Sequence, residues 1–332
     1  MVFAVLIILF FTPLYNSTFY DKNDIHIAIY YSTIQDYAEE VKTVMNYSWT
    51  YENIRYTIHP TIITKQSVLN DELLSYDVLV IPGSGQPYID ALDPLWKKMV
   101  KQFIEQGGGY IGICGGANIA SMGFKDDIGI NNFLNQSVLE IVNVYVNNQQ
   151  DEEWQYLWRA NWEQGGLPIN VFLPQNNNPI FQELHNTNRS IRYWGGPGMY
   201  PAHKIDHRLG DVIPLGAYSE EAMDVAPLHF WGWNLRQPYQ RENITTDIKD
   251  QYAIVASTYG LGRIVLFGPH PERATFFDGY IEEFPVRPHL APFTWFIYNW
   301  ISENQSSISY NWWMLRRSVA WIVQVSLPPI ED

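Results

Sequence analysis

The chain has 332 residues, a formal net charge of −14 and 46% hydrophobic residues. This composition is typical of a folded protein that can bury a large core, as two domains or as one elaborated α/β domain. The net negative charge argues against nucleic acid or an anionic membrane surface as a partner, because both need a basic patch. A single cysteine excludes an intramolecular disulfide and leaves the redox compartment open.

The N-terminal sequence "MVFAVLIILFFTPLY" is apolar without interruption from Val2 to Phe11. This length is typical of the hydrophobic part of a signal peptide and is short of the ~20 residues that span a bilayer. No Lys or Arg precedes the run, no small-x-small cleavage site follows it, and a buried first strand is the alternative. We predict that residues 1–20 form an export signal or a membrane anchor, so that the protein is exported or anchored and not cytoplasmic.

Six Asn-x-Ser/Thr sequons favour the same compartment. They begin at Asn16, Asn46, Asn135, Asn188, Asn243 and Asn304.

Strand and helix patterns alternate over the first part of the chain. Strands are predicted in "IHIAIYY" (25–31), "IRYTIHPTII", residues 77–81 and "YIGIC". Helical spacing is found in "TIQDYAEEVKTVMNY", with Ile34, Tyr37, Val41 and Val44 on one face. A second helix is predicted in "YIDALDPLWKKMVKQFIEQGGG", with Leu95, Met99, Phe103 and Ile104 facing inward, and a third after Gly116. This alternation indicates an α/β fold, in which a parallel sheet carries helices on both faces.

A loop-rich β insertion is predicted at about 140–250, where "VLEIVNVYVNN" is a possible strand. Two strands around the turn "YGLGR" follow, in "QYAIVASTYGLGRIVLFGPHPE". "PFTWFIYNWI" predicts a closing apolar helix. The α/β domain then covers 24–305, and 306–332 form an amphipathic tail that packs on it, with a membrane-surface role left open.

Cys114 lies in "GGGYIGICGGANIAS", between a predicted strand and a predicted helix. Such a turn exposes its central side chain and needs glycines, because larger residues would contact the neighbouring strand and helix. The N-terminus of the following helix favours the thiolate, which is the nucleophilic form. The pattern therefore predicts a nucleophile elbow.

A second glycine turn follows the predicted strand in "VLVIPGSG". Sites in parallel sheets lie at the carboxyl ends of the strands, so this turn is expected beside Cys114. We predict that backbone N–H groups of Gly83, Ser84 and Gly85, with that of Gly115, form an oxyanion hole.

His270 and Glu272 are two residues apart in "GPHPE", after another predicted strand. Alternate residues of an extended chain point the same way, and a proline on either side of His270 keeps the chain extended. His270 is predicted to act as the general base for Cys114, and Glu272 to orient its imidazole.

Four segments carry a family resemblance: "LVIPGSGQPYI", "FIEQGGGYIGICGGANIAS", "IRYWGGPGM" and "GRIVLFGPHPE". The chain resembles the class I glutamine amidotransferase-like superfamily, and within it the domain found at the N-terminus of biotin–protein ligases. The resemblance implies a Cys–His–Glu triad on a flavodoxin-like, mostly parallel sheet. It also implies a substrate-binding rim over Cys114, formed by Arg192, Tyr193, Trp194, Gly195 and Gly196.

The sequence departs from the family pattern at several points. Amidotransferases that hydrolyse glutamine resemble Cys-x-Gly-x-Gln, and here the last position, which helps to bind substrate, is Asn118. Related cysteine peptidases usually have His directly after Cys, where this chain has Gly115. About 60 residues follow Glu272, so no biotin-ligating domain is expected there, and an amidotransferase would need a partner to receive ammonia.

The sequence thus favours a cysteine-nucleophile hydrolase or amidotransferase-like protein acting on an amide or related bond. Its expected substrate is a small molecule or peptide-like, its protein partner is open, and no cofactor is expected. The alternative is a non-catalytic binding or regulatory module that keeps the fold. No metal is expected, because His203 and His207 suit one only in a helix, where Pro201 and the lack of a third ligand argue against it.

Overall fold

A computed structural model describes residues 23–31, 35–126, 130–147, 165–184, 186–234, 237–285 and 296–331. The predicted signal or anchor over 1–20 lies outside these ranges. Within them, no helix is long and apolar enough to cross a membrane.

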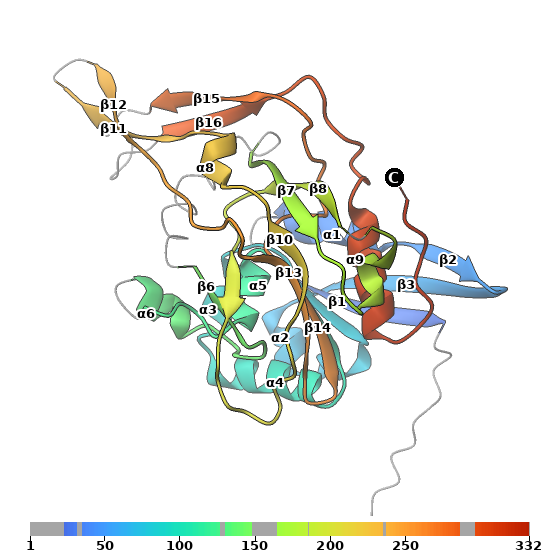
Figure 1. The fold of residues 1–332 in the computed structure, drawn as a ribbon. Coiled ribbons are helices and arrows are strands. Elements are labelled where there is room, and N and C mark those ends of the chain that lie inside the picture. Colours follow the sequence, from blue (N-terminus) through green and yellow to red (C-terminus); the bar gives the residue numbers. More distant parts are fainter. Residues whose placement is uncertain are drawn as a thin grey trace, which may run out of the picture.

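Five parallel strands form the centre of the sheet, in the order β3-β1-β4-β5-β14 (Figure 1). These strands are β1 (Asp24–Tyr30), β3 (Ile54–Ile63), β4 (Val78–Ile81), β5 (Gly109–Ile113) and β14 (Gly262–Phe267). When these five strands are numbered 1 to 5 along the chain, their order across the sheet is 2-1-3-4-5, which is the flavodoxin-like order. Strands β4 and β5 are buried along their whole length, as parallel strands covered on both faces must be. The predicted fold class and these strands are confirmed.

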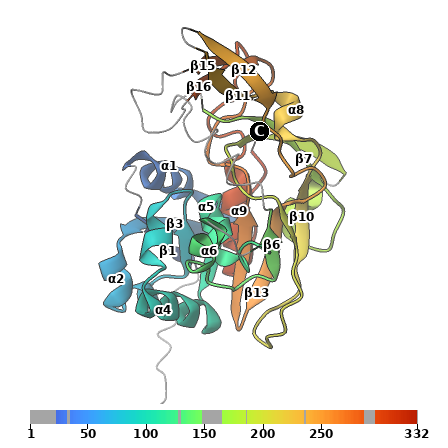
Figure 2. The same cartoon turned by 90° about the vertical axis from the view of Figure 1, so that its left-hand side faces the viewer.

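Helices cover both faces of the parallel strands (Figures 1 and 2). One face packs against α1 (Gln35–Met45) and α9 (Trp312–Ile322). The other face packs against α2 (Lys65–Leu69), α4 (Pro94–Glu105) and α5 (Gly115–Ala120). The predicted inward residues Tyr37, Val41 and Val44 of α1 are buried, and Ile34 lies outside the described residues. Shorter helices are η1 (Glu72–Ser75), α3 (Gln86–Asp90), α6 (Ile130–Asn135), η2 (Pro179–Leu184) and α8 (Ala222–Val225).

The single helix predicted around residues 88–109 is wrong, because α3 and α4 are separate helices. The Asp93 carboxylate accepts a hydrogen bond of 2.9 Å from the Leu95 N–H and caps α4, whose first residue is Pro94. Phe103 and Ile104 face inward as predicted, but Leu95 is 53% exposed. Trp96 and Val100 are buried with them, since positions 96, 100, 103 and 104 form one stripe of the helix.

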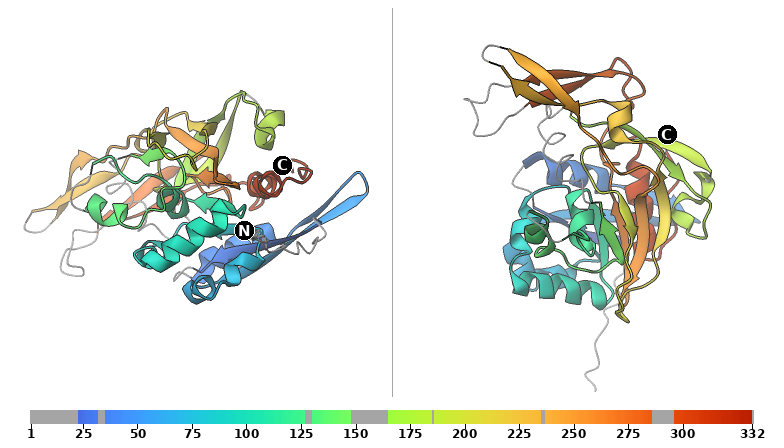
Figure 3. Two further views of the ribbon diagram at one scale, coloured as in Figure 1. Left: turned by 90° about the horizontal axis from the view of Figure 1, so that it is seen from below. Right: turned by 60° about the vertical axis from the view of Figure 1, so that its left-hand side comes forward.

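The insertion extends the sheet with antiparallel strands. The order continues from β14 through β13 (Tyr252–Tyr259), β10 (Ile213–Tyr218) and β7 (Leu167–Leu173) to β8 (Thr187–Tyr193). The strands β13 and β14 pair around the "YGLGR" turn, as predicted. The possible strand in "VLEIVNVYVNN" is limited to β6 (Val144–Val146), which pairs with β9 (Met199–Pro201). At the other edge, β2 (Ser48–Tyr51) pairs with β3 in a ribbon that projects from the sheet (Figure 3).

Two β-hairpins lie together at one end of the molecule (Figures 1 and 3). They consist of β11 (His229–Trp233) with β12 (Pro238–Asn243), and of β15 (Tyr280–Pro285) with β16 (Phe296–Ile301). The Glu283 carboxylate joins them, at 2.7 Å from His229 Nδ1 and 2.6 Å from Trp231 Nε1. The helix predicted in "PFTWFIYNWI" is therefore wrong over 296–301, where Tyr298 and Trp300 are buried at the two-residue period of a strand.

Helix α9 packs against the sheet, as the pattern of the tail predicts. Its two arginines are buried: Arg316 is 7% exposed and Arg317 is 3% exposed. Arg317 Nε donates to the Ile180 carbonyl at 2.6 Å, and Arg316 Nε donates to the Val44 carbonyl at 3.0 Å. These guanidinium groups bind backbone oxygens of other elements, so the described tail is an integral part of the fold.

Candidate active site

Cys114 follows β5 directly and precedes α5. Its backbone has φ 51° and ψ −107°, a conformation that costs free energy for any residue except glycine. The Cys114 N–H donates to the Phe267 carbonyl at 2.7 Å, which holds the turn against β14. A Cβ on Gly116 would lie 2.0 Å from the Ile81 carbonyl oxygen, so only glycine fits there. The thiol is therefore held at a sharp strand-to-helix turn at the carboxyl end of the parallel strands.

His270 and Glu272 lie beyond the end of the neighbouring strand, β14. The His270 N–H donates to the Arg192 carbonyl at 2.8 Å, and this bond fixes the chain next to β8. His270 Nδ1 is 2.6 Å from Glu272 Oε1, and both side chains are buried. The imidazole and the Cys114 thiol both lie beside Gly83, where an added Cβ would be 3.0 Å from His270 Cε1 and 3.4 Å from Cys114 Sγ. The three side chains therefore form one cluster.

The charges in this cluster stabilise one another. Burial acts to lower the pKa of the His270 imidazole, but the negative charges of Glu272 and Cys114 outweigh it and raise that pKa from its ordinary 6.5 to about 9. Burial acts to raise the pKa of the Glu272 carboxyl, but the His270 and Arg273 cations outweigh it and lower that pKa. His270 is therefore protonated at neutral pH when Cys114 and Glu272 are both ionised.

The glycine turn after β4 lies directly against the cluster. A Cβ on Gly83 would lie 2.9 Å from Cys114 Cβ and 3.0 Å from His270 Cε1. A Cβ on Gly115 would lie 3.3 Å from the Ser84 nitrogen, so the turn and the start of α5 are in contact. Gly85 is exposed, and a Cβ there would have no neighbour within 4 Å. Gly83, Ser84 and Gly115 thus adjoin Cys114, whereas Gly85 faces solvent.

Asn118 lies one turn along α5 from Cys114 and is buried. Its Nδ2 donates to the Tyr88 hydroxyl at 2.8 Å. Its Oδ1 has no hydrogen-bond partner among the described residues. The Tyr88 ring lies near Gly115, so it is close to the site although the sequence did not single it out.

The predicted rim residues lie in different environments. The Trp194 ring meets the His270 ring edge-on, with centroids 6.3 Å apart. Tyr193 is fully buried in the core, with its ring against Tyr218. Gly195 has φ 69°, and Gly196 contacts Gly268, whose carbonyl oxygen would lie 1.8 Å from an added Cβ. Trp194 therefore adjoins the cluster directly, whereas Tyr193 and Gly196 shape the backbone and core behind it.

Besides Tyr88, three residues beside the cluster were not assigned to the site from the sequence: Tyr37, Glu40 and Arg273. Arg273 directly follows Glu272, and its guanidinium is 2.7 Å from Glu40 Oε2. The guanidinium carbon lies 4.8 Å from the Tyr37 ring centroid and 4.9 Å from that of Trp194. Only Arg273 could have been found from the sequence, because it directly follows Glu272. Tyr37 and Glu40 come from α1, which is far away in the sequence.

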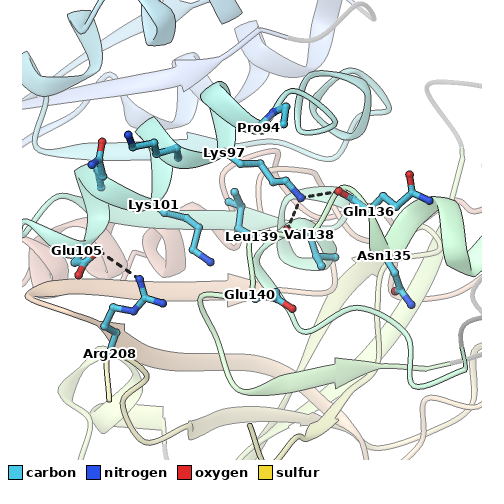
Figure 4. A pocket seen from close by; sticks show the side chains of 12 residues that line it. Pro94, Lys97, Lys101, Glu105, Asn135, Gln136, Val138, Leu139, Glu140 and Arg208 are labelled. Atoms are coloured by element: carbon cyan, nitrogen blue, oxygen red, sulfur yellow. Dashed lines mark hydrogen bonds and ion pairs between the residues drawn. The ribbon is translucent and has the colours of Figure 1, made fainter. Parts of the chain in front are cut away.

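The pocket drawn in Figure 4 is separate from this cluster. It has a volume of about 580 Å³ and lies between α4, residues 135–140 and Arg208. Lys97 donates to the carbonyls of Gln136 and Val138 there, at 2.6 and 3.2 Å. The pocket shares no residue with the Cys114 site. In the part of the chain that the structure describes, no group of three or more His, Cys, Asp and Glu side chains could hold a metal ion. His203 and His207 lie outside any helix.

A flavodoxin-like core with a cysteine at the turn after its fourth strand is typical of glutamine amidotransferase-like proteins. The family model described as "Biotin-protein ligase, N terminal" matches residues 37–281, more than half of the chain. The chain therefore belongs to the biotin-protein ligase N-terminal family. No curated protein matches the sequence.

Several solved structures are similar to this chain. PurLQS from Thermotoga maritima is 14% identical, over 75% of this chain and 88% of that chain, with a TM-score of 0.38. A ThuA-like protein from Bacteroides uniformis is 14% identical, over 77% and 85%, with a TM-score of 0.39. A protein described as a GMP synthase subunit from Thermoplasma acidophilum is 13% identical, over 75% and 84%, with a TM-score of 0.39.

Proposed function

We propose that the protein is a cysteine-nucleophile hydrolase or amidotransferase-like enzyme that acts on an amide or related bond. One observation carries this proposal. Cys114, whose backbone φ is 51° at the end of β5, lies beside a His270 imidazole whose Nδ1 is 2.6 Å from Glu272 Oε1. A nucleophile, a base within its reach and a group that orients the base are the three parts that covalent catalysis requires.

The reaction follows from these positions. The Cys114 thiolate attacks the carbonyl carbon, a C–S bond forms, and the carbonyl π electrons move to the oxygen. The intermediate collapses to a thioester, the C–N bond breaks, and the His270 imidazolium gives its proton to the leaving amine. His270 then takes a proton from the water that attacks the thioester, the C–S bond breaks, and the thiolate is released with a carboxylic acid that gives its proton to solvent. Glu272 stabilises the imidazolium before it protonates the amine and again after it takes the proton from water.

The contact between Ser84 and Gly115 supports an oxyanion hole beside Cys114. The N–H groups of the first turn of a helix have no partner within the helix, so that of Gly115 is available for a ligand. With the N–H of Ser84 it would stabilise the negative oxygen of the tetrahedral intermediate. Gly85 is the least suited of the four predicted residues, because it faces solvent.

The substrate-binding proposal centres on Trp194 and Asn118. Trp194 lies beside the imidazole, and Asn118 holds a buried acceptor without a partner among the described residues. The Asn118 amide donates to Tyr88, whereas the glutamine at this position of the Cys-x-Gly-x-Gln pattern helps to bind substrate. We therefore propose a small-molecule or peptide-like amide as the substrate and do not assign glutamine.

A non-catalytic binding or regulatory module is the second candidate. The observation that favours it is the low exposure of the nucleophile and its base, since Cys114 is 9% exposed and His270 is 2% exposed. A substrate must reach the thiol for catalysis, so reactivity of Cys114 separates the two candidates.

The test is alkylation of Cys114 by iodoacetamide from pH 5 to 10, read by mass spectrometry. Because the chain has one cysteine, the same protein unfolded in urea supplies a matched free thiol, and Cys114→Ser supplies the blank. We expect the folded thiol to react faster than the unfolded one at pH 6 and to keep its rate between pH 6 and 8. A folded-state rate that falls tenfold per pH unit below about 8.5, as for an ordinary thiol, would refute the proposal.

Export or membrane anchoring through residues 1–20 is a further part of the proposal. It rests on the apolar run from Val2 to Phe11. A stand-alone hydrolase fits an exported protein better than an amidotransferase that must pass ammonia to a partner. Mass spectrometry of the mature N-terminus distinguishes a cleaved signal from a retained segment.

A further inference from the structure

The ion pair between Glu40 and Arg273 joins helix α1 to the turn that carries Glu272. Its two side chains are 2.7 Å apart, and they come from positions 233 residues apart in the chain. The Arg273 side chain is 7% exposed and that of Glu40 is 34% exposed, so the guanidinium is the more deeply buried partner. An ion pair with a buried guanidinium is screened much less than one on the surface.

Arg273 is held on three sides beside the Cys–His–Glu cluster. Its N–H donates to the His270 carbonyl at 3.3 Å, within the tight turn that follows His270. Its guanidinium lies against the rings of both Tyr37 and Trp194, which meet edge-on, and Trp194 in turn adjoins the His270 ring. The guanidinium charge helps to lower the pKa of Glu272. Glu272 Oε2 has no hydrogen-bond partner among the described residues.

Charged groups from each neighbouring element face the cluster. With the thiolate and imidazolium formed, the negative groups are Cys114, Glu272 and Glu40, and the positive groups are His270, Arg273 and Arg192. Tyr37 of α1 and Tyr88 of α3 also face it, and burial keeps both hydroxyls neutral by raising their pKa values. Three negative charges therefore meet three positive charges, and this balance fails if either Glu40 or Arg273 is neutralised.

We propose that Glu40 and Arg273 form a charge pair that sets the protonation equilibria of Cys114 and His270, with Glu40 acting through Arg273 as a positioning residue. This inference rests on the proposed function, since it describes how that site is tuned. Neither residue is assigned a covalent step. Glu40 holds the guanidinium in place and cancels its excess charge.

The sign of each effect follows from the charge balance. Glu40→Gln leaves one excess positive charge, which favours the thiolate and disfavours the imidazolium, so the pKa values of Cys114 and His270 both fall. Arg273→Gln leaves one excess negative charge, so both pKa values rise. We expect shifts of about 0.5–1 pH unit in each direction, smaller than the roughly 1–3 units that a directly neighbouring charge produces.

The experiment is the pH profile of Cys114 alkylation in the full chain. The variants are Glu40→Gln, Arg273→Gln, the charge-conserving Arg273→Lys, and the double variant Glu40→Gln with Arg273→Gln. The matched control is Glu39→Gln, because Glu39 neighbours Glu40 on α1 but is exposed and pairs with Lys42. Urea unfolding shows which variants remain folded at 25 °C. If the Arg273 variants do not remain folded, the Glu40→Gln variant alone tests the inference.

Three results together support the inference. The midpoint shifts in opposite directions in the Glu40→Gln and Arg273→Gln variants. It shifts less in Arg273→Lys, and it returns towards the wild-type value in the double variant. A merely structural tether would lower stability and leave the midpoint within about 0.2 pH unit of wild type, which would overturn it. A wild-type midpoint near that of the unfolded chain would refute the proposed function instead, and opposite shifts in the variants would still support the charge pair.

Discussion

Cys114 and His270 approach each other across Gly83, which leaves no room for a side chain between them. An added methyl group would lie 2.9 Å from Cys114 Cβ, 3.4 Å from its Sγ and 3.0 Å from His270 Cε1. The glycine turn after β4 therefore determines how closely the thiol and the imidazole can approach, in addition to any role of its N–H groups.

Gly83→Ala should separate the thiol from the imidazole. Contacts near 3.0 Å force Cys114 or His270 to move, and overpacking of this kind costs about 1–3 kcal/mol. We expect the alkylation rate of Cys114 at pH 6–7 to fall at least tenfold. Gly85→Ala is the matched control and should keep the wild-type rate, because its Cβ meets nothing within 4 Å. Equal rates in both variants would contradict this account.

Replacing the imidazole should return Cys114 to ordinary thiol behaviour. In His270→Gln the alkylation midpoint should rise to that of the unfolded chain, and in Glu272→Gln it should rise by a smaller amount, since the imidazole remains but loses its 2.6 Å partner. The control is His229→Gln, which removes a comparable pair with Glu283 in the hairpins. A wild-type profile in His270→Gln would show that the thiol is not activated by this residue.

The stability contributed by His270 should depend on pH. Its pKa is raised from 6.5 in the unfolded chain to about 9 in the folded protein, so its stabilising contribution is fully present below pH 6.5 and is lost as the pH rises through about 9. The difference in free energy of unfolding between wild type and His270→Gln should therefore shrink by about 1–3 kcal/mol between pH 6 and pH 10. Urea titrations at pH 6, 8 and 10 measure this, and a constant difference would refute it.

Arg317 of α9 should be important for stability and not for reactivity. Its guanidinium donates to the carbonyls of Ile180, Pro328 and Pro179, at 2.6, 2.9 and 3.0 Å. Arg317→Leu leaves these oxygens without a donor and should lower the free energy of unfolding by about 2–4 kcal/mol. Glu183→Gln tests the ion pair alone and should cost less than about 1 kcal/mol, since Glu183 is 59% exposed. Equal losses in the two variants would contradict this.

Local patterns in the sequence predicted the parallel half of the fold. Buried runs such as "VLVI" and "YIGI" end in glycine turns, and both the strand and the turn after it are encoded within a few residues. The pairing of His270 with Glu272 was also available, because the two residues are only two positions apart. The extended chain predicted there is wrong, since residues 271 and 272 form a turn in which the Arg273 N–H donates to the His270 carbonyl. A predicted strand is confirmed where the residues of the segment itself, and not its distant partners, specify the strand.

The features that depend on distant contacts were not predictable. "FIYNWI" is apolar enough for a helix, and its pairing with β15 makes it a strand. The continuation of the sheet beyond β13, through β10, β7 and β8, depends on pairing between segments that are far apart in the sequence. Glu40 and Arg273 carry no motif, and only the packing of α1 beside the turn after His270 brings them together.

The pairing of β5 with β14 has a consequence for synthesis of the chain. Ile113 is the direct neighbour of Phe267 in this parallel pair, so Cys114 and His270 are positioned by a contact between residues more than 150 positions apart. While the ribosome is still making the insertion, an unfinished chain holds Cys114 without its base. The thiol thus gains its partner only after the last strand of the parallel core has been synthesised, and a truncated product would carry an ordinary cysteine.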